Sequence, residues 1–205
     1  MKTFTSTLVA LSAAALLTTA AFDTRAADFT FSGDITFHND IVQIDFTLDT
    51  AASGVRIWTD SWLSGLNFDP TAALWRGTGS DFALLATVDD DDTVGPGQGY
   101  YDAGFHLDTL AAGHYRVTLA AAVNAPVGAW LSQGFAYDGE TPIPVALWNQ
   151  PTYDPNANDQ KGSFWRIHLS SVDTASAVPE AGSAWLLLAG IGALCAARGR
   201  RNASA

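Results

Sequence analysis

Apolar and polar residues alternate along much of the chain between residues 28 and 170. The longest such run has Val42, Ile44, Phe46 and Leu48 on one side and polar residues between them. Because successive side chains of a β-strand point to opposite faces, this run predicts a half-buried strand. Shorter alternations predict further strands, at Phe29/Phe31, Ile35/Phe37, Phe105/Leu107, Tyr115/Val117/Leu119 and Trp165/Ile167/Leu169.

Turn-forming residues separate these predicted strands. Gly, Asp, Asn and Pro cluster between the alternating runs, for example at residues 32–34, 38–40 and 95–97. Many short strands with turns at this spacing predict an all-β fold, an antiparallel β-sandwich or jelly roll formed by residues 28–170. The polar segment 148–162 is expected to form a surface loop. The Ser-, Ala- and Thr-rich residues 171–177 are expected to form a flexible linker.

The chain begins with the pattern of an export signal. Lys2 precedes an apolar run from Leu8 to Leu17, and small residues follow it. A positive start, a short apolar core and small residues, in this order, are typical of a secretory signal peptide, here residues 1–27. Small side chains offer several cleavage positions, after Ala20, Ala21, Ala26 or Ala27.

A second apolar segment, residues 181–197, lies near the C-terminus and carries no charge. It is preceded by Val178, Pro179 and Glu180 and followed by Arg198, Arg200 and Arg201. Its length is at the lower limit for a helix that crosses about 30 Å of hydrocarbon. Arginines hold their flank in the cytoplasm, so the domain is expected on the outer side of that membrane. A stop-transfer helix without further function is the simpler alternative.

The order of Pro-Glu motif, apolar helix and terminal arginines resembles the PEP-CTERM sorting signal of Gram-negative bacteria, here over residues 178–201. Ala181 stands where that signal usually has a second proline. The resemblance implies a partner, the sorting transpeptidase called exosortase, that cuts at the motif. It also implies a precursor anchored in the inner membrane and a final place at the cell surface or in the extracellular matrix, typically in biofilm-forming species.

Composition narrows the class of partner. The formal net charge is −11, and the two terminal segments hold half of the Lys and Arg residues, so the central domain is more acidic still. Such a domain repels phosphates, which argues against nucleic acid as a partner, and attracts divalent cations. The single cysteine, Cys195, lies in the C-terminal apolar segment, so the domain is expected to fold without a disulfide.

A run of four aspartates, Asp89, Asp90, Asp91 and Asp92, follows the apolar residues 84–88. A Gly-rich loop leads from this run to Asp102. Adjacent carboxylates repel one another, and a bound cation would relieve that repulsion. Calcium fits such a site, because it accepts about six to eight oxygen ligands in a flexible geometry. The five aspartates are therefore candidate calcium ligands, and a solvated acidic turn is the alternative.

Several short motifs surround the aspartate run. They are Asn67-Phe68-Asp69-Pro70, Ala73-Leu74-Trp75, Gly77-Thr78-Gly79, Leu84-Leu85-Ala86 and Gly113-His114-Tyr115-Arg116-Val117. In this order they resemble the bacterial pre-peptidase C-terminal type of β-sandwich, over roughly residues 69–119. The resemblance implies a non-catalytic accessory domain of a secreted protein, in some cases with calcium bound, and the same five aspartates as ligands.

The chain has seven tryptophans, whose flat faces could stack on sugar rings. Most aromatic side chains in a sandwich fill its core, so few of these are expected to be available. Trp148, which lies beside Asn149 and Gln150 in a polar segment, is predicted to be the exposed one. The other candidates in the domain are Trp58, Trp62, Trp75 and Trp130.

No catalytic signature is present in the sequence. The four histidines are scattered, and neither a Gly-x-Ser-x-Gly nor a His-Glu-x-x-His motif occurs. The sequence therefore predicts a non-enzymatic exported surface or extracellular-matrix protein that makes calcium-dependent or polysaccharide contacts. The alternatives are a carbohydrate-binding module that recognises exopolysaccharide and a secreted hydrolase whose site has no familiar motif.

Overall fold

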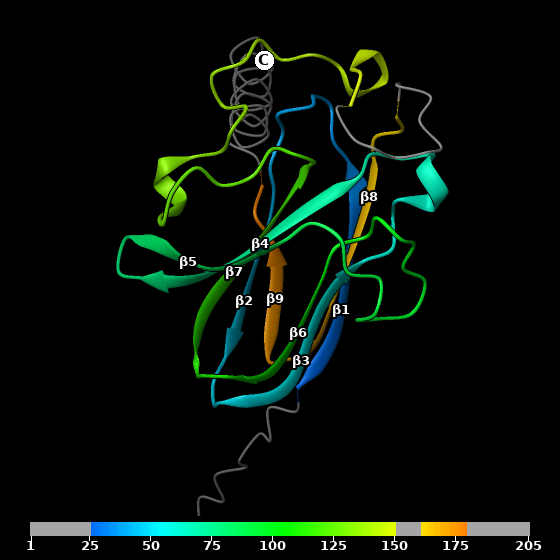
Figure 1. Ribbon diagram of the computed structural model, residues 1–205. Helices are drawn as coiled ribbons and strands as arrows, with labels where there is room; N and C mark the ends of the chain where they lie inside the picture. Colours follow the sequence, from blue (N-terminus) through cyan, green and yellow to red (C-terminus); the bar gives the residue numbers. More distant parts are fainter. Residues whose placement is uncertain (1–25, 151–160, 180–205) are drawn as a thin grey trace, which may run out of the picture.

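The computed structural model describes residues 26–150 and 161–179. In this part of the chain nine strands form two antiparallel sheets, accompanied by three short 3-10 turns (Figure 1). The predicted all-β sandwich is thus confirmed. No helix among these residues is long and apolar enough to cross a membrane. Residues 1–25 of the predicted signal peptide, Glu180 of the predicted sorting motif, the C-terminal apolar segment and Arg198, Arg200 and Arg201 lie outside the described residues. Ala27, the last residue of the predicted signal peptide, is the first residue of β1.

The first sheet has four strands in the order β1-β8-β3-β6. Their bounds are Ala27–Asp34 for β1, Phe164–Val172 for β8, Ala52–Thr59 for β3 and Gly104–Leu110 for β6. The second sheet has five strands in the order β5-β4-β7-β2-β9. Their bounds are Asp81–Val88 for β5, Pro70–Thr78 for β4, Gly113–Ala121 for β7, Val42–Leu48 for β2 and Thr174–Ala177 for β9. The strongest predicted strand coincides with β2.

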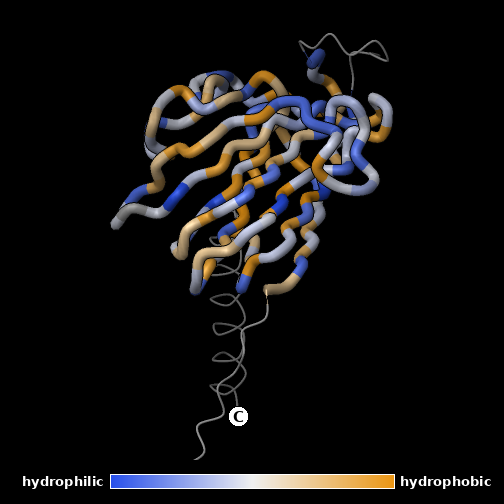
Figure 2. Tube along the Cα trace, turned by 60° about the horizontal axis from the view of Figure 1, so that its bottom comes forward, coloured by the Kyte–Doolittle hydropathy of each residue, from blue (hydrophilic) through white to orange (hydrophobic). Residues whose placement is uncertain are grey.

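The main core lies between the two sheets and is built from the alternating apolar residues. Ile44, Phe46 and Leu48 of β2 are buried there, as the alternation predicts. Val117 of β7 and Leu169 of β8 belong to the same core and have no exposed surface. Figure 2 shows the resulting alternation of hydrophobic and hydrophilic residues along the strands.

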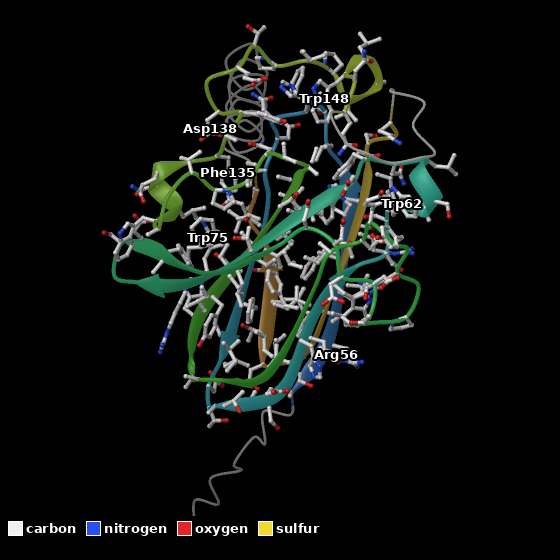
Figure 3. All side chains as sticks on the ribbon, viewed as in Figure 1. Arg56, Trp62, Trp75, Phe135, Asp138 and Trp148 are labelled. Carbon is white, nitrogen blue, oxygen red and sulfur yellow. The ribbon has the colours of Figure 1, made fainter. Side chains whose placement is uncertain are left out.

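A long connection between β7 and β8 covers part of the outer face of the five-stranded sheet, over β4 and β5. We call residues 124–148 the cap; it contains the 3-10 turns η2 (Leu131–Gln133) and η3 (Val145–Leu147). Phe135 of the cap packs on Trp75 and Ala73 of β4, which point away from the main core. Figure 3 shows Trp75 and Phe135 facing each other between the sheet and the cap. Strand β4 is therefore buried on both faces.

Residues 171–177 differ from the flexible linker that their composition predicts. Residues 171 and 172 end β8, and residues 174–177 form β9, which pairs antiparallel with β2. The amide of Val178 still donates to the carbonyl of Gln43, at 2.9 Å. Ala175 packs against the main core, so the small residues of β9 close the edge of the sheet beside β2. Pairing with a neighbouring strand outweighs the weak intrinsic preference of this segment.

The longer connections gather at one end of the sandwich, where they hold the residues discussed below (Figure 1). This loop end contains the β1–β2 connection, the segment with the 3-10 turn η1 (Leu63–Gly65), the aspartate run after β5 and much of the cap. Short turns join β2 to β3 and β6 to β7 at the opposite end.

Candidate functional site

Three carboxylates meet at the loop end, where β4 begins and β5 ends. Ala72 of β4 pairs with Val88 of β5, so the residues before β4 lie opposite those after β5. As a result one carboxylate oxygen each of Asp69, Asp89 and Asp90 lies within 4.8 Å of the others. Asp69 is buried, whereas Asp89 and Asp90 are exposed. We call these three residues the acidic cluster.

The charges of the acidic cluster act on one another. Although Asp90 is largely exposed, partial desolvation of its carboxylate, together with the neighbouring charge of Asp89, raises its pKa above the usual value. The hydroxyl of Thr71 donates a hydrogen bond to Asp89 Oδ1. All candidate ligand atoms in the cluster are oxygens, which suits a hard cation such as calcium better than zinc, whose protein sites usually include His or Cys. Asp69 was not among the ligands predicted from the sequence, because its approach to the aspartate run depends on the β4–β5 register.

The other predicted ligands are arranged differently. Asp91 closes its own turn, since its Oδ1 accepts hydrogen bonds from the amide of Thr93 at 3.0 Å and from the Thr93 hydroxyl at 2.6 Å. Asp92 is exposed. The structure therefore brings Asp89 and Asp90 together with Asp69, and it does not bring Asp91, Asp92 or Asp102 into the same group.

Asp102 is a buried structural carboxylate. Its Oδ1 accepts hydrogen bonds from the Thr59 hydroxyl at 2.8 Å and from the amides of Ser61 and Trp62 at 2.9 and 3.2 Å. Its Oδ2 accepts the amide of Gly99 at 2.7 Å. These bonds join the segment after β3 to the Gly-rich loop before β6. Four donors of the chain itself thus hold this carboxylate in place.

A pocket of about 290 Å³ lies beside the acidic cluster. Its lining residues are Thr71, Thr87, Val88, Asp89, Val123 and Ala125. Asp89 belongs both to this lining and to the acidic cluster. A ligand in the pocket would therefore be close to any cation that the cluster holds.

The structure corrects the expected position of Trp148. This side chain is only 8 % exposed, because its ring packs on His38 and lies near Tyr137 at the loop end (Figure 3). Among the described residues the exposed tryptophan is Trp130, at 43 %. Polarity of the neighbouring residues misled the sequence prediction, because Gln150 turns inward and bonds to the backbone of Asp69.

Trp130 lies on a firmly held turn beside the edge strand β5. Its amide donates to Gln133 Oε1 at 3.0 Å, and the amide of Leu84 donates to the carbonyl of Ala129 at 2.9 Å. The hydroxyl of Ser132 donates to Asp81 Oδ2 at 2.5 Å. That hydrogen bond is the main reason why the pKa of Asp81 lies below its usual value. These hydrogen bonds hold the turn that carries the indole against β5.

A histidine–aspartate pair lies on the outer face of the four-stranded sheet. His168 Nε2 is 3.1 Å from Asp60 Oδ1, and His168 Nδ1 is 2.9 Å from the hydroxyl of Thr30. Arg166 clamps Asp60 with two bonds, at 2.6 and 2.7 Å. Burial alone would raise the pKa of Asp60, but the bonds from Arg166 and His168 outweigh it and hold that pKa below its usual value. The pair does not line the 290 Å³ pocket.

Comparisons with known proteins add no family to this description. No protein-family model matches the chain, and no curated protein matches it with significant similarity.

Proposed function

We propose that this chain is a non-enzymatic protein of the cell surface or extracellular matrix whose acidic loop end binds calcium. The observation that carries the proposal is the convergence of Asp69, Asp89 and Asp90. A cation at this position would offset the repulsion between the carboxylates. The adjoining pocket offers room for part of a polysaccharide or another extracellular ligand beside the ion.

Calcium is expected to stabilise the folded protein. At 1 mM free calcium and a dissociation constant on the order of 10 µM, the midpoint of thermal unfolding should rise by about 5–10 °C relative to chelator. Asp89→Asn and Asp90→Asn should each remove this rise, because each deletes a charged ligand. Asp92→Asn is the matched control from the same run and should keep it. Differential scanning calorimetry with and without calcium measures these midpoints.

Without calcium, the Asp90→Asn variant should be more stable than the wild type. The raised pKa of Asp90 means that the folded state holds this proton more tightly than the unfolded state does. Ionisation of Asp90 therefore lowers stability as the pH rises through these pKa values, and the cost persists at pH 7. Asp90→Asn should then unfold at a higher temperature than the wild type without calcium. If calcium does not change the unfolding midpoint of the wild type, the calcium proposal is wrong and the aspartate run is a solvated turn.

The route to the cell surface is part of the proposal. A signal peptide at residues 1–27 would start export, and an exosortase-type transpeptidase would act at Val178, Pro179 and Glu180. Before that step the apolar segment 181–197 and the arginines after it would hold the precursor in the inner membrane. The support for this route is the order of motif, apolar segment and arginines in the sequence.

Carbohydrate binding is the second candidate function, and the exposed Trp130 favours it. The flat indole can pack on the C–H face of a sugar ring. Asp81, Ser132 and Gln133 surround its turn with polar groups. The turn is fixed before a ligand arrives, which lowers the entropy lost on binding.

Trp130→Ala is expected to weaken binding to an exopolysaccharide by at least about tenfold, as the loss of a buried aromatic contact does at other interfaces. Tyr100→Ala, which also removes an exposed aromatic ring, is the control and should change affinity little. Affinity electrophoresis against purified acidic and neutral exopolysaccharides measures both variants. Equal retardation of wild type and Trp130→Ala in every gel would rule out stacking at this residue.

Hydrolysis would contradict the leading proposal. If the purified chain cleaves a polysaccharide or a peptide panel, the hydrolase alternative gains support. The Asp60–His168 pair would then be the first place to look for the responsible groups.

A further inference from the structure

His38 lies in the connection between β1 and β2, and the cap encloses it completely, leaving it 0 % exposed. Its ring centre is 5.1 Å from that of Trp148 and 5.4 Å from that of Tyr137. Backbone bonds run beside it in both directions, from the amide of His38 to the carbonyl of Ile143 and from the amide of Val145 to the carbonyl of Thr36. His38 therefore lies where the β1–β2 connection meets the cap, and its ring and its backbone both contact cap residues.

The hydrogen bonds of His38 fix the position of its proton. The amide of Ile143 donates to Nδ1 at 3.1 Å. Because an amide N–H can only donate, Nδ1 must carry a lone pair, and the single ring proton lies on Nε2. Nε2 then donates to Glu140 Oε2, at 3.1 Å. The closed cap thus requires a neutral imidazole in one tautomer.

A second proton on the ring is incompatible with this arrangement. It would place an N–H group at Nδ1 against the N–H group of Ile143. Two buried donors would then face each other without an acceptor. Glu140 faces the Nε2 side, so its carboxylate attracts an imidazolium without resolving the conflict at Nδ1. Among the described residues, the other ring neighbours of His38 carry no compensating charge: burial raises the pKa of Tyr137, which stays neutral, and Trp148 is uncharged. Asp40, on the same connection, is occupied by the amides of Thr36 and Phe37.

We propose that His38 is an acid-sensitive latch, which holds the cap closed when neutral and releases it when Nδ1 is protonated. Release would reach the acidic cluster, because Trp148 is followed closely by Gln150. The amide of Asp69 donates to Gln150 Oε1 at 3.1 Å, and Gln150 Nε2 donates to the carbonyls of Asp69 and Ala122. A cap that opens at Trp148 therefore loosens a contact that positions the buried carboxylate of the acidic cluster.

Hydrogen exchange of the cap amides tests the latch. With the full chain in detergent micelles, exchange is followed by mass spectrometry at pH 7.5 and pH 5.5 and corrected for the intrinsic pH dependence of amide exchange. Most carboxylates stay ionised over this range, while an exposed imidazole gains its proton. If only the open cap binds that proton, protection of residues 136–148 should fall by about tenfold between the two values.

His38→Asn is the decisive variant. The asparagine Oδ1 can accept the Ile143 amide as Nδ1 does, but it cannot be protonated, so the drop in protection should disappear. His106→Asn, at an exposed strand position, is the matched control and should retain the drop. If His38→Asn shows the same pH response as the wild type, the latch is excluded.

A second measurement uses the wild type alone. Nitrogen chemical shifts of the imidazole report protonation of Nδ1 directly, and they should move together with the loss of protection at Ile143. An Nδ1 that gains a proton at pH 5.5 while the Ile143 amide stays protected would overturn the proposal. This result is independent of whether calcium binds to the acidic cluster.

Discussion

Replacing Asp102 by alanine should lower the free energy of unfolding by about 3–5 kcal/mol. The substitution removes the common acceptor of the buried amides of Ser61 and Trp62, of the part-buried amide of Gly99 and of the buried Thr59 hydroxyl. An unsatisfied buried donor costs about 1–3 kcal/mol, while relief from burying the carboxylate charge returns part of the total. Chemical denaturation followed by tryptophan fluorescence measures the change.

Two variants make the Asp102 result specific. Asp102→Asn keeps an acceptor at the Oδ1 position but turns an amide donor toward Gly99, so it should cost about 1–2 kcal/mol. Asp108→Ala removes an exposed aspartate from β6 and should change stability by less than about 0.5 kcal/mol. If Asp102→Ala is as stable as Asp108→Ala, the carboxylate does not hold the two segments together.

Trp75→Ala is expected to lower the free energy of unfolding by about 3–5 kcal/mol. Trp75 has no exposed surface, and it fills the space between the five-stranded sheet and the cap. Its indole N–H also donates to the Thr118 hydroxyl at 3.0 Å, a bond that the truncation removes. Because the cavity opens under the cap and not in the main core, hydrogen exchange should accelerate most in residues 124–140.

Trp130→Ala is the matched control for this prediction, since it deletes the same side chain from an exposed site and should cost well under 1 kcal/mol. Trp75→Phe retains most of the apolar volume and should fall between the two. Uniform acceleration of exchange across both sheets in Trp75→Ala would show that the cap and the sandwich unfold as one unit.

The strands that the sequence predicts correctly are those with one face on the core. Strand β2 alternates because Ile44 and Phe46 point inward while Gln43 and Asp45 lie on the other face. Strands β1, β6, β7 and β8 were located by the same signal. The pair Ile35 and Phe37 also alternates, yet it follows the end of β1, and Phe37 forms only an isolated bridge with Pro144 of the cap.

Two strands that give no alternating signal, β3 and β4, are covered on both faces over part of their length. In β4, Leu74 faces the main core while Ala73 and Trp75 lie under the cap, so the sequence is continuously apolar there. In β3, Trp58 points away from the main core but is buried beneath Gly95, which packs directly on its ring. Such coverage comes from distant loops, which local periodicity cannot report.

Only part of the candidate site could be predicted from the sequence, for a related reason. Neighbouring aspartates suggested a shared cation, but neighbours on a chain often point apart, and Asp91 turns back onto Thr93. Asp69 joins Asp89 through the pairing of β4 with β5, twenty residues along the chain. Its position just before β4 became informative only once that pairing was known.

Strand β9 sets how the domain would respond to tension. In a protein held by its C-terminal tail, as we propose, a pulling force enters the sandwich through this edge strand. The strand has four residues, and Ala175 is the one among them that packs on the core. Its detachment from β2 would lengthen the tether by roughly 13 Å, at about 3.3 Å per residue, and leave the other strands of both sheets paired. The last strand would then act as a short segment that extends under force between the domain and its anchor.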